Sequence, residues 1–328
     1  MPHEVVLTGL DGTNPLGFMA ALGVLTVLSA RSDPKTVGPT LSWRAESGWR
    51  PAVSGASELD ELIEIIDDDR QAWATAPILA FRYVKLEKKG PKLVGGMRPS
   101  AAVLRAWLAR RLDRNDSASL SHACALWSEG AYTETSGTAP TREVLRLHSV
   151  EATQDVPLSR VLLPTHFDFT SRNAQFLEQA EQIRGYVTPE RMLAELSSAQ
   201  GDSSAPRTLD WDTLTDIPGA LAGSQSAGFR PGTEWLAFRG LSMLPVHATG
   251  HALQTTACTG RRKSGSFTWP LWTPSLSPDT TRSLIAYPRL AQIAAAERSA
   301  MGIGAVFTSK LTKKADGYAG VFAPSAPT

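Results

Sequence analysis

A run of apolar residues near the start of the chain gives the clearest pattern in the sequence. Residues 16–28 carry no charge, and Asn14 and Pro15 precede them. Asn is favoured at a helix N-cap, and Pro at the first helical position. A helix that is apolar on nearly every side lies in a protein core or in a membrane, but these 13 residues are fewer than the roughly 20 that cross a bilayer. The pattern therefore predicts a buried central helix over residues 14–30.

The neighbours of this run agree with a core helix. Small residues within it, among them Gly17 and Gly23, would let another backbone approach closely. A secretory signal peptide is the alternative, but Glu4 and Asp11 precede the run and no Lys or Arg does. The missing basic leader argues against a signal peptide.

The rest of the chain mixes helical and strand-like spacing in an irregular order. Helical spacing predicts helices over residues 58–74, 189–199, 233–241 and 292–300, one with a buried face at Phe176, Ala180 and Ile183, and one capped by Ser277. Strand-like segments are 5–10, 41–49, 51–54, 78–86, 243–246, 267–272 and 303–311. An irregular order is typical of an α+β fold, in which helices pack on a mixed or largely antiparallel sheet.

We expect two halves. Residues 1–150 form an N-terminal α+β half with the buried helix and a basic loop, and residues 151–328 form a C-terminal α+β half with a basic-tipped hairpin. A Thr-, Ser- and Gly-rich stretch at 131–143 marks the boundary. The last residues, 322–328, are expected to be frayed.

Composition is ordinary for a globular protein. The 328 residues are 42% hydrophobic and 20% charged, and the formal net charge is +1. The two cysteines, Cys124 and Cys258, make no disulfide framework, which suits a reducing, cytoplasmic location. The chain is therefore no global polycation.

Charge is nevertheless segregated along the sequence. Residues 82–114 contain ten basic and two acidic residues, and residues 261–328 contain nine basic and three acidic ones. Acidic residues gather at 58–69 and 178–216. Two basic zones on a neutral chain favour local contact with phosphates, and solvated surface is the alternative.

Three segments and one strand end supply the candidate nucleic-acid contacts. They are a Gly-containing loop at 85–98, the first turn of a helix that Thr170 or Ser171 caps, a hairpin tip, and the end of the last long strand. Glycine lets a backbone approach closely, while Lys and Arg neutralise phosphates. The candidates are Lys85, Lys88, Lys89, Lys92, Arg98, Arg172, Asn173, Gln175, Arg261, Arg262, Lys263, Lys310, Lys313 and Lys314.

Signs of catalysis are weak. His166 and Asp168 could act as a base and its orienting carboxylate, but no GxSxG, GxGxxG or GKS/GKT motif is present. His247, His251 and Cys258 could ligate a metal, but the segment is not helical and lacks the Glu of HExxH. We therefore expect no catalytic residues, no metal and no cofactor. A nucleic-acid-processing enzyme using His166 and Asp168, and a protein-binding scaffold, are the alternatives.

Several pieces of the sequence together resemble the subunit at the large-subunit position of CRISPR type I-G (formerly I-U) interference complexes. The pieces are GTNPLGF at 12–18, AALG at 20–23, LDWD at 209–212, GTEWLAF at 232–238, GLSMLPV at 240–246 and FTWPLW at 267–272. They span most of the chain.

This resemblance implies a non-catalytic, nucleic-acid-binding subunit of an RNA-guided surveillance (Cascade) complex in antiviral defence. The implied partners are CRISPR RNA, target double-stranded DNA, the other Cascade subunits and a separate helicase-nuclease, with no membrane. The implied roles are checking the motif beside the target, holding the opened strands and recruiting the helicase-nuclease.

Overall fold

The computed structural model describes thirteen stretches of the chain. They are residues 3–33, 37–75, 83–87, 90–94, 142–147, 150–157, 166–169, 176–202, 209–213, 229–249, 252–260, 264–313 and 320–328.

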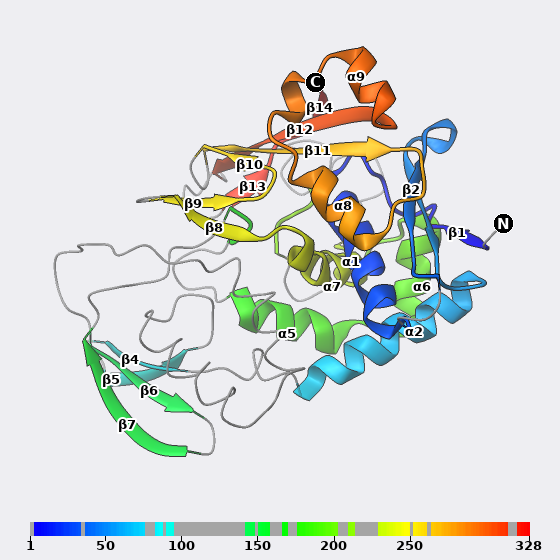
Figure 1. Cartoon of the computed structure of the whole chain (residues 1–328). Helices are drawn as coiled ribbons and strands as arrows, with labels where there is room; N and C mark the ends of the chain where they lie inside the picture. Colours follow the sequence, from blue (N-terminus) through cyan, green and yellow to red (C-terminus); the bar gives the residue numbers. More distant parts are fainter. Residues whose placement is uncertain are drawn as a thin grey trace, which may run out of the picture.

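The fold is α+β, as the sequence predicts, and every strand pairing between the described residues is antiparallel (Figure 1). One sheet has the order β1-β3-β2, and another has the order β10-β11-β12-β13 with β14 also on β12. A third has the order β5-β4-β6-β7, and β8 pairs with β9. The strands are β1 (Glu4–Val6), β2 (Leu41–Arg44), β3 (Arg50–Ser54), β4 (Tyr83–Glu87), β5 (Gly90–Val94), β6 (Arg142–Leu147), β7 (Val150–Pro157), β8 (Val246–Thr249), β9 (Ala252–Thr255), β10 (Cys258–Thr259), β11 (Ser266–Trp272), β12 (Ile303–Lys313), β13 (Gly320–Phe322) and β14 (Ala326–Pro327).

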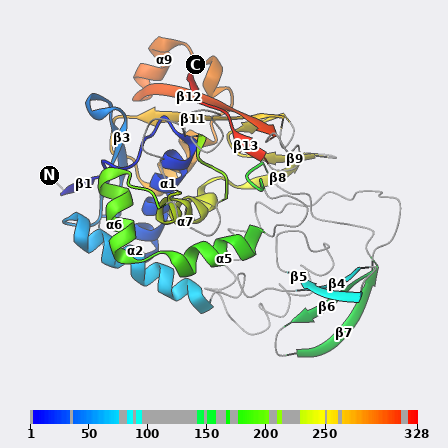
Figure 2. The same ribbon diagram turned by 180° about the vertical axis from the view of Figure 1, so that it is seen from behind.

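The helices largely match the predicted ranges, and α1, α8 and α9 contact β3, β11 and β12, respectively. Seen from behind, α5 and α6 lie against α7 (Figure 2). The α-helices are α1 (Pro15–Arg31), α2 (Leu59–Ala72), α5 (Phe176–Tyr186), α6 (Pro189–Ser198), α7 (Pro231–Gly240), α8 (Pro278–Ile285) and α9 (Ala295–Ala300). Short 3-10 helices are η1 (Ala45–Ser47), η2 (Trp73–Thr75), η5 (Leu241–Met243) and η6 (Leu290–Gln292). In the part of the chain described, no helix is both long and apolar enough to cross a bilayer.

Helix α1 confirms the predicted buried central helix. The Asn14 side chain accepts a hydrogen bond from the Leu16 N–H at 2.9 Å, and Pro15 is the first helical residue. Residues 15–25 of the helix are all buried, together with Val27 and Leu28. Because α1 has apolar contacts on all sides, it lies at the centre of the core rather than on its surface.

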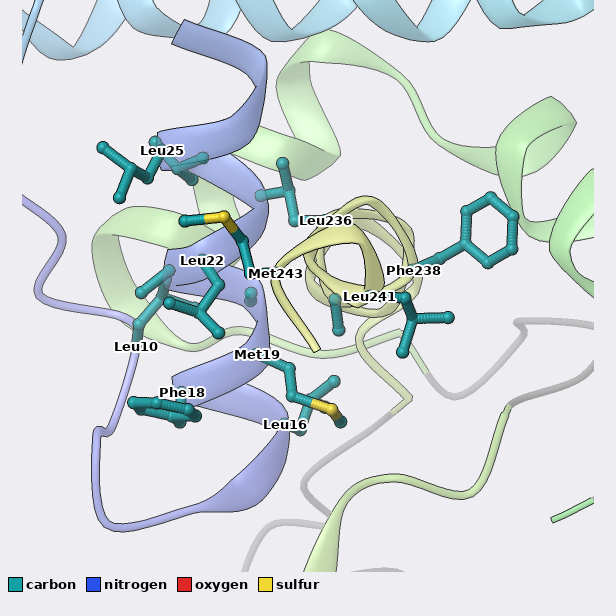
Figure 3. Close-up of a cluster of buried hydrophobic side chains, with 14 of the residues drawn as sticks. Leu10, Leu16, Phe18, Met19, Leu22, Leu25, Leu236, Phe238, Leu241 and Met243 are labelled. Atoms are coloured by element: carbon teal, nitrogen blue, oxygen red, sulfur yellow. The ribbon is translucent and has the colours of Figure 1, made fainter. Parts of the chain in front are cut away.

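Helix α7 crosses α1 at backbone contact. A Cβ placed on Gly23 would lie 1.8 Å from the carbonyl oxygen of Leu236, and one on Gly240 would lie 2.2 Å from the carbonyl oxygen of Met19. Figure 3 shows Met19, Leu22 and Leu236 around this crossing. The small residues of α1 thus allow the backbone of α7 to approach closely, as the sequence predicts.

Aromatic residues join the N-terminal segment to β11. The Phe18 ring lies 5.8 Å from that of Trp43 and 5.9 Å from that of Trp269, centroid to centroid. The indole N–H of Trp269 donates to the carbonyl of Gly12 at 2.8 Å, and that of Trp272 donates to the carbonyl of Leu41 at 2.8 Å. The hydrophobic core therefore contains residues from both predicted halves, and the division at residue 150 stays a prediction.

Three local predictions are wrong. Residues 85–98 are not one loop, because Lys85 belongs to β4 and Lys92 to β5. The predicted strand at 243–246 is largely absent, because Met243 ends η5 and only Val246 lies in a strand, β8, which pairs with β9. The C-terminal residues are not frayed, since Phe322 lies in β13 and β14 pairs with β12. Strands β4 and β5, and strands β8 and β9, are each joined by a short connection, whereas β14 pairs with the more distant β12. The spacing of apolar residues along the chain does not reveal these pairings.

Candidate nucleic-acid interface

Four of the predicted contact residues fall on described strands. Lys310 and Lys313 belong to β12 and are exposed. Lys85 of β4 and Lys92 of β5 are register partners, and Lys85 is also the register partner of Glu143 in β6. The remaining candidates lie outside the described residues: Lys88, Lys89, Arg98, Arg172, Asn173, Gln175, Arg261, Arg262, Lys263 and Lys314.

The sheet register brings Lys310 next to two hydroxyl side chains. Ser266 of β11 pairs with Lys310 of β12 on one side and with Thr259 of β10 on the other. Directly paired residues of an antiparallel sheet project to the same face. The hydroxyls of Thr259 and Ser266 lie 2.7 Å apart, which agrees with this placement. One row across three strands therefore presents two hydroxyls and an ammonium group.

A second row of hydroxyls follows on the same face. Thr268 pairs with Thr308, and their hydroxyl oxygens lie 2.8 Å apart. The Thr328 hydroxyl lies 3.2 Å from that of Thr308. The alternate residues Phe267 and Trp269 point the other way and are fully buried. We call the side chains of Thr259, Ser266, Thr268, Thr308 and Lys310 the polar face.

A buried histidine fixes one end of the polar face. His166 is 3% exposed, and its Nδ1 lies 3.0 Å from the hydroxyl of Thr255, while its Nε2 lies 3.1 Å from the carbonyl oxygen of Gly260. A carbonyl only accepts, so Nε2 donates to Gly260, while the Thr255 hydroxyl can either donate to Nδ1 or accept from it. This geometry gives His166 a structural role beside β10. Its use as a catalytic base with Asp168, which is also buried, stays a prediction.

Sequence reasoning missed a buried polar network that joins the start of α1 to the start of α7. Arg230 donates to Asp212 through Nη2 at 2.7 Å and Nε at 3.2 Å, and the Asn14 amide donates to the other carboxylate oxygen at 2.8 Å. The carboxylate of Asp212 joins the cap of α1 to the residue before α7, which is a structural task and leaves it little contact with solvent.

Glu195 of α6 is a second buried carboxyl group and lies at the start of α7. It accepts from the N–H groups of Gly232 at 3.0 Å and Thr233 at 2.7 Å, and from the Thr233 hydroxyl at 2.9 Å. Burial raises the pKa of Glu195 from 4.5 to about 7, and these hydrogen bonds and the charge of Arg230 oppose the rise. Between pH 4.5 and about 7, Glu195 keeps its proton in the folded protein, whereas in the unfolded chain it has released that proton.

Glu195 should therefore make the protein less stable as pH rises. Its contribution is fully present below about pH 4.5 and is lost as pH passes about 7. Compared with Glu195→Gln, the wild type should lose about 3 kcal/mol of unfolding free energy across this window, at 1.36 kcal/mol per pKa unit. Urea unfolding of both proteins at pH 4.5, 6 and 8 measures this difference. A difference that stays constant with pH would show that the carboxyl titrates as it does in the unfolded chain.

The described residues contain no group of three or more His, Cys, Asp or Glu side chains placed to hold a metal ion. His247 lies in β8 and Cys258 is buried in β10, while His251 lies outside the described residues.

No protein-family model matches the chain, and no curated protein matches it.

Sequence reasoning found Lys310 but missed the hydroxyl side chains around it. The alternation of Ser266 and Thr268 with Phe267 and Trp269 was the available signal, because it marks one apolar and one polar face of a strand. Which residues of β10 and β12 extend that face depends on register, which the alternation does not specify.

Proposed function

We propose that this chain binds nucleic acid through the polar face, contacting the sugar-phosphate backbone and performing no chemistry on it. The observation that carries the proposal is the row formed by Thr259, Ser266 and Lys310. Hydroxyl groups and Lys are common partners of phosphate oxygens, and neighbouring positions on one face of a sheet present several of them to one nucleic-acid strand. Because the net charge is only +1, binding would depend on this local arrangement rather than on the whole surface.

The distribution of acidic residues supports this choice of face. Asp60, Glu61, Glu64 and Asp68 of α2 are exposed. Figure 1 places α2 at the lower part of the molecule, and β11 and β12 at the upper part. A polyanion would be repelled from α2 and attracted to the sheet that carries Lys310 and Lys313.

The resemblance to CRISPR type I-G large-position subunits supports a more specific form of the proposal. In that form the chain is a cytoplasmic, non-catalytic subunit of a Cascade complex that works with CRISPR RNA, target double-stranded DNA, the other subunits and a helicase-nuclease. The polar face would contact a phosphate backbone in the assembly. The predicted residues Arg261, Arg262 and Lys263 belong to the segment between β10 and β11 and would add to the same contact.

The two alternatives have less support. A nucleic-acid-processing enzyme would use His166 as a base, but the ring nitrogens of His166 contact Thr255 and Gly260 in a buried position. A protein-binding scaffold would use the basic residues for an acidic partner. It predicts no binding of RNA or DNA by the free chain or by its complex.

The salt dependence of oligonucleotide binding tests the proposal. We expect the logarithm of the association constant for a single-stranded oligonucleotide to fall linearly with the logarithm of salt concentration, by about 0.7 for each phosphate neutralised. Fluorescence anisotropy between about 50 and 200 mM salt measures this slope. Absence of binding at the lowest salt, for both RNA and DNA, would reject the proposal.

A further inference from the structure

A pocket opens beside the polar face, where the α8–η6 segment meets β9, β10 and β11. Its volume is about 460 Å³. This lies within the roughly 300–1,000 Å³ that is typical of small-molecule sites. Thr259 and Thr268 belong both to the pocket lining and to the polar face. A nucleic-acid strand bound along the polar face would therefore pass the opening of the pocket.

The lining has an apolar floor and a polar rim. Ile285 and Leu290 are buried and form part of the floor. Tyr287 and Arg289, both exposed, lie on the rim. None of the described lining residues is acidic, and Arg289 has no ion-pair partner among the residues that the structure describes.

The rim residues are suited to a flat heteroaromatic ring that carries a nearby phosphate. The hydroxyl of Tyr287 donates to a carboxylate oxygen of Glu297 at 3.3 Å, which restrains the ring while 37% of the residue stays exposed. Aromatic rings and guanidinium groups stack on unpaired bases, and Arg also binds phosphates. Gln292, exposed on the same rim, offers an amide to hydrogen-bond the edge of a base.

Two pocket residues have a left-handed backbone. Ala257 has φ +63° and Arg289 has φ +67°, and only five non-glycine residues of the described chain have positive φ. They come from two separate segments of the lining, the turn between β9 and β10 and the segment after α8. Side-chain-bearing residues adopt this conformation at a cost, and such positions cluster at functional sites.

We propose that this pocket holds a single unpaired nucleobase of a strand bound along the polar face. The inference rests on the proposed function and adds to it the recognition of an unstacked base. The base would stack against Tyr287, and the neighbouring phosphate would contact Arg289. A free mononucleotide has the same chemistry, so the experiment must separate the two sources.

The test compares an intact oligonucleotide with one that has a single abasic position, using the full chain. Tyr287→Ala should weaken binding of the intact oligonucleotide about 5- to 10-fold, at the low end of base–aromatic stacking because the ring is partly exposed. It should leave binding of the abasic oligonucleotide and the salt slope unchanged. Tyr287→Phe retains the ring, loses only the hydrogen bond to Glu297, and should bind the intact oligonucleotide more tightly than Tyr287→Ala does. Phe229→Ala removes a ring of similar exposure, 38%, elsewhere and is the matched control.

The outcomes separate this inference from the proposed function. If Tyr287→Ala weakens both oligonucleotides equally, or neither, while the wild type still binds with a salt slope, the base pocket is wrong and the polar face stands. If the wild type binds no oligonucleotide, the proposed function fails and the inference fails with it. If a mononucleotide alone competes at the affinity of the intact oligonucleotide, a strand is not the source of the base.

Discussion

Gly23→Ala should lower the free energy of unfolding by about 3–5 kcal/mol, at the upper end of single substitutions. The new Cβ would lie 1.8 Å from the carbonyl oxygen of Leu236, and its nearest neighbours are backbone atoms rather than a flexible side chain. Helices α1 and α7 would have to move apart, which would open the core around Met19, Leu22 and Leu236. Urea unfolding followed by circular dichroism measures the loss.

A glycine in open space is the control for this substitution. Gly185 lies in α5, and a Cβ there would meet no heavy atom within 4 Å. Because Ala favours helix over Gly, Gly185→Ala should be neutral or stabilising by up to about 1 kcal/mol. If Gly23→Ala were as stable as Gly185→Ala, the two helices could not cross at backbone contact.

Arg230→Met should lower the free energy of unfolding by about 3–5 kcal/mol. The substitution retains an apolar side chain of similar length but removes the Arg230 guanidinium from the buried Asp212 carboxylate. The side chains of Arg230 and Asp212 are only 7% and 11% exposed, so water has little access to solvate the carboxylate in place of the guanidinium. Chemical unfolding at pH 7 measures the effect.

Two further variants show whether charge is the cause. Adding Asp212→Asn to Arg230→Met removes the buried charge and should recover at least about 1 kcal/mol. Arg31→Ala breaks an exposed pair with Asp68 and should cost no more than about 1 kcal/mol. A double variant less stable than Arg230→Met would contradict the account, because the missing ion pair would then not explain the loss.

Capping residues and apolar spacing predict the helices whose formation depends on residues close together in the sequence. Asn14 and Pro15 marked the start of α1, and Thr188 and Ser277 cap α6 and α8, where their side chains accept from Arg191 and Thr280. The helical spacing at 233–241 likewise predicts α7. In these cases capping and burial both follow from residues close together in the sequence.

Strand pairing could not be predicted in this way. Nothing near Ser266 indicates that Lys310 is its partner, because the two are joined only by the register of β11 and β12. The same reason applies to the pairing of β14 with β12. Strands β8 and β9 are neighbours in the sequence, with Thr249 paired to Ala252, and their period-2 pattern is too short to predict them. The pocket depends on Ala257 and Arg289, whose positive φ has no sequence signal, since neither residue is a glycine or an asparagine.

The most direct measurement of the central claim is the change in salt slope caused by Lys310→Ala. Arg31→Ala removes the same charge from the end of α1 and serves as the matched control. If the polar face holds the phosphate backbone, Lys310→Ala should weaken oligonucleotide binding and make the slope about 0.7 less steep, while Arg31→Ala leaves the slope unchanged. Equal slopes for the wild type and both variants would contradict the claim that nucleic acid lies on this face.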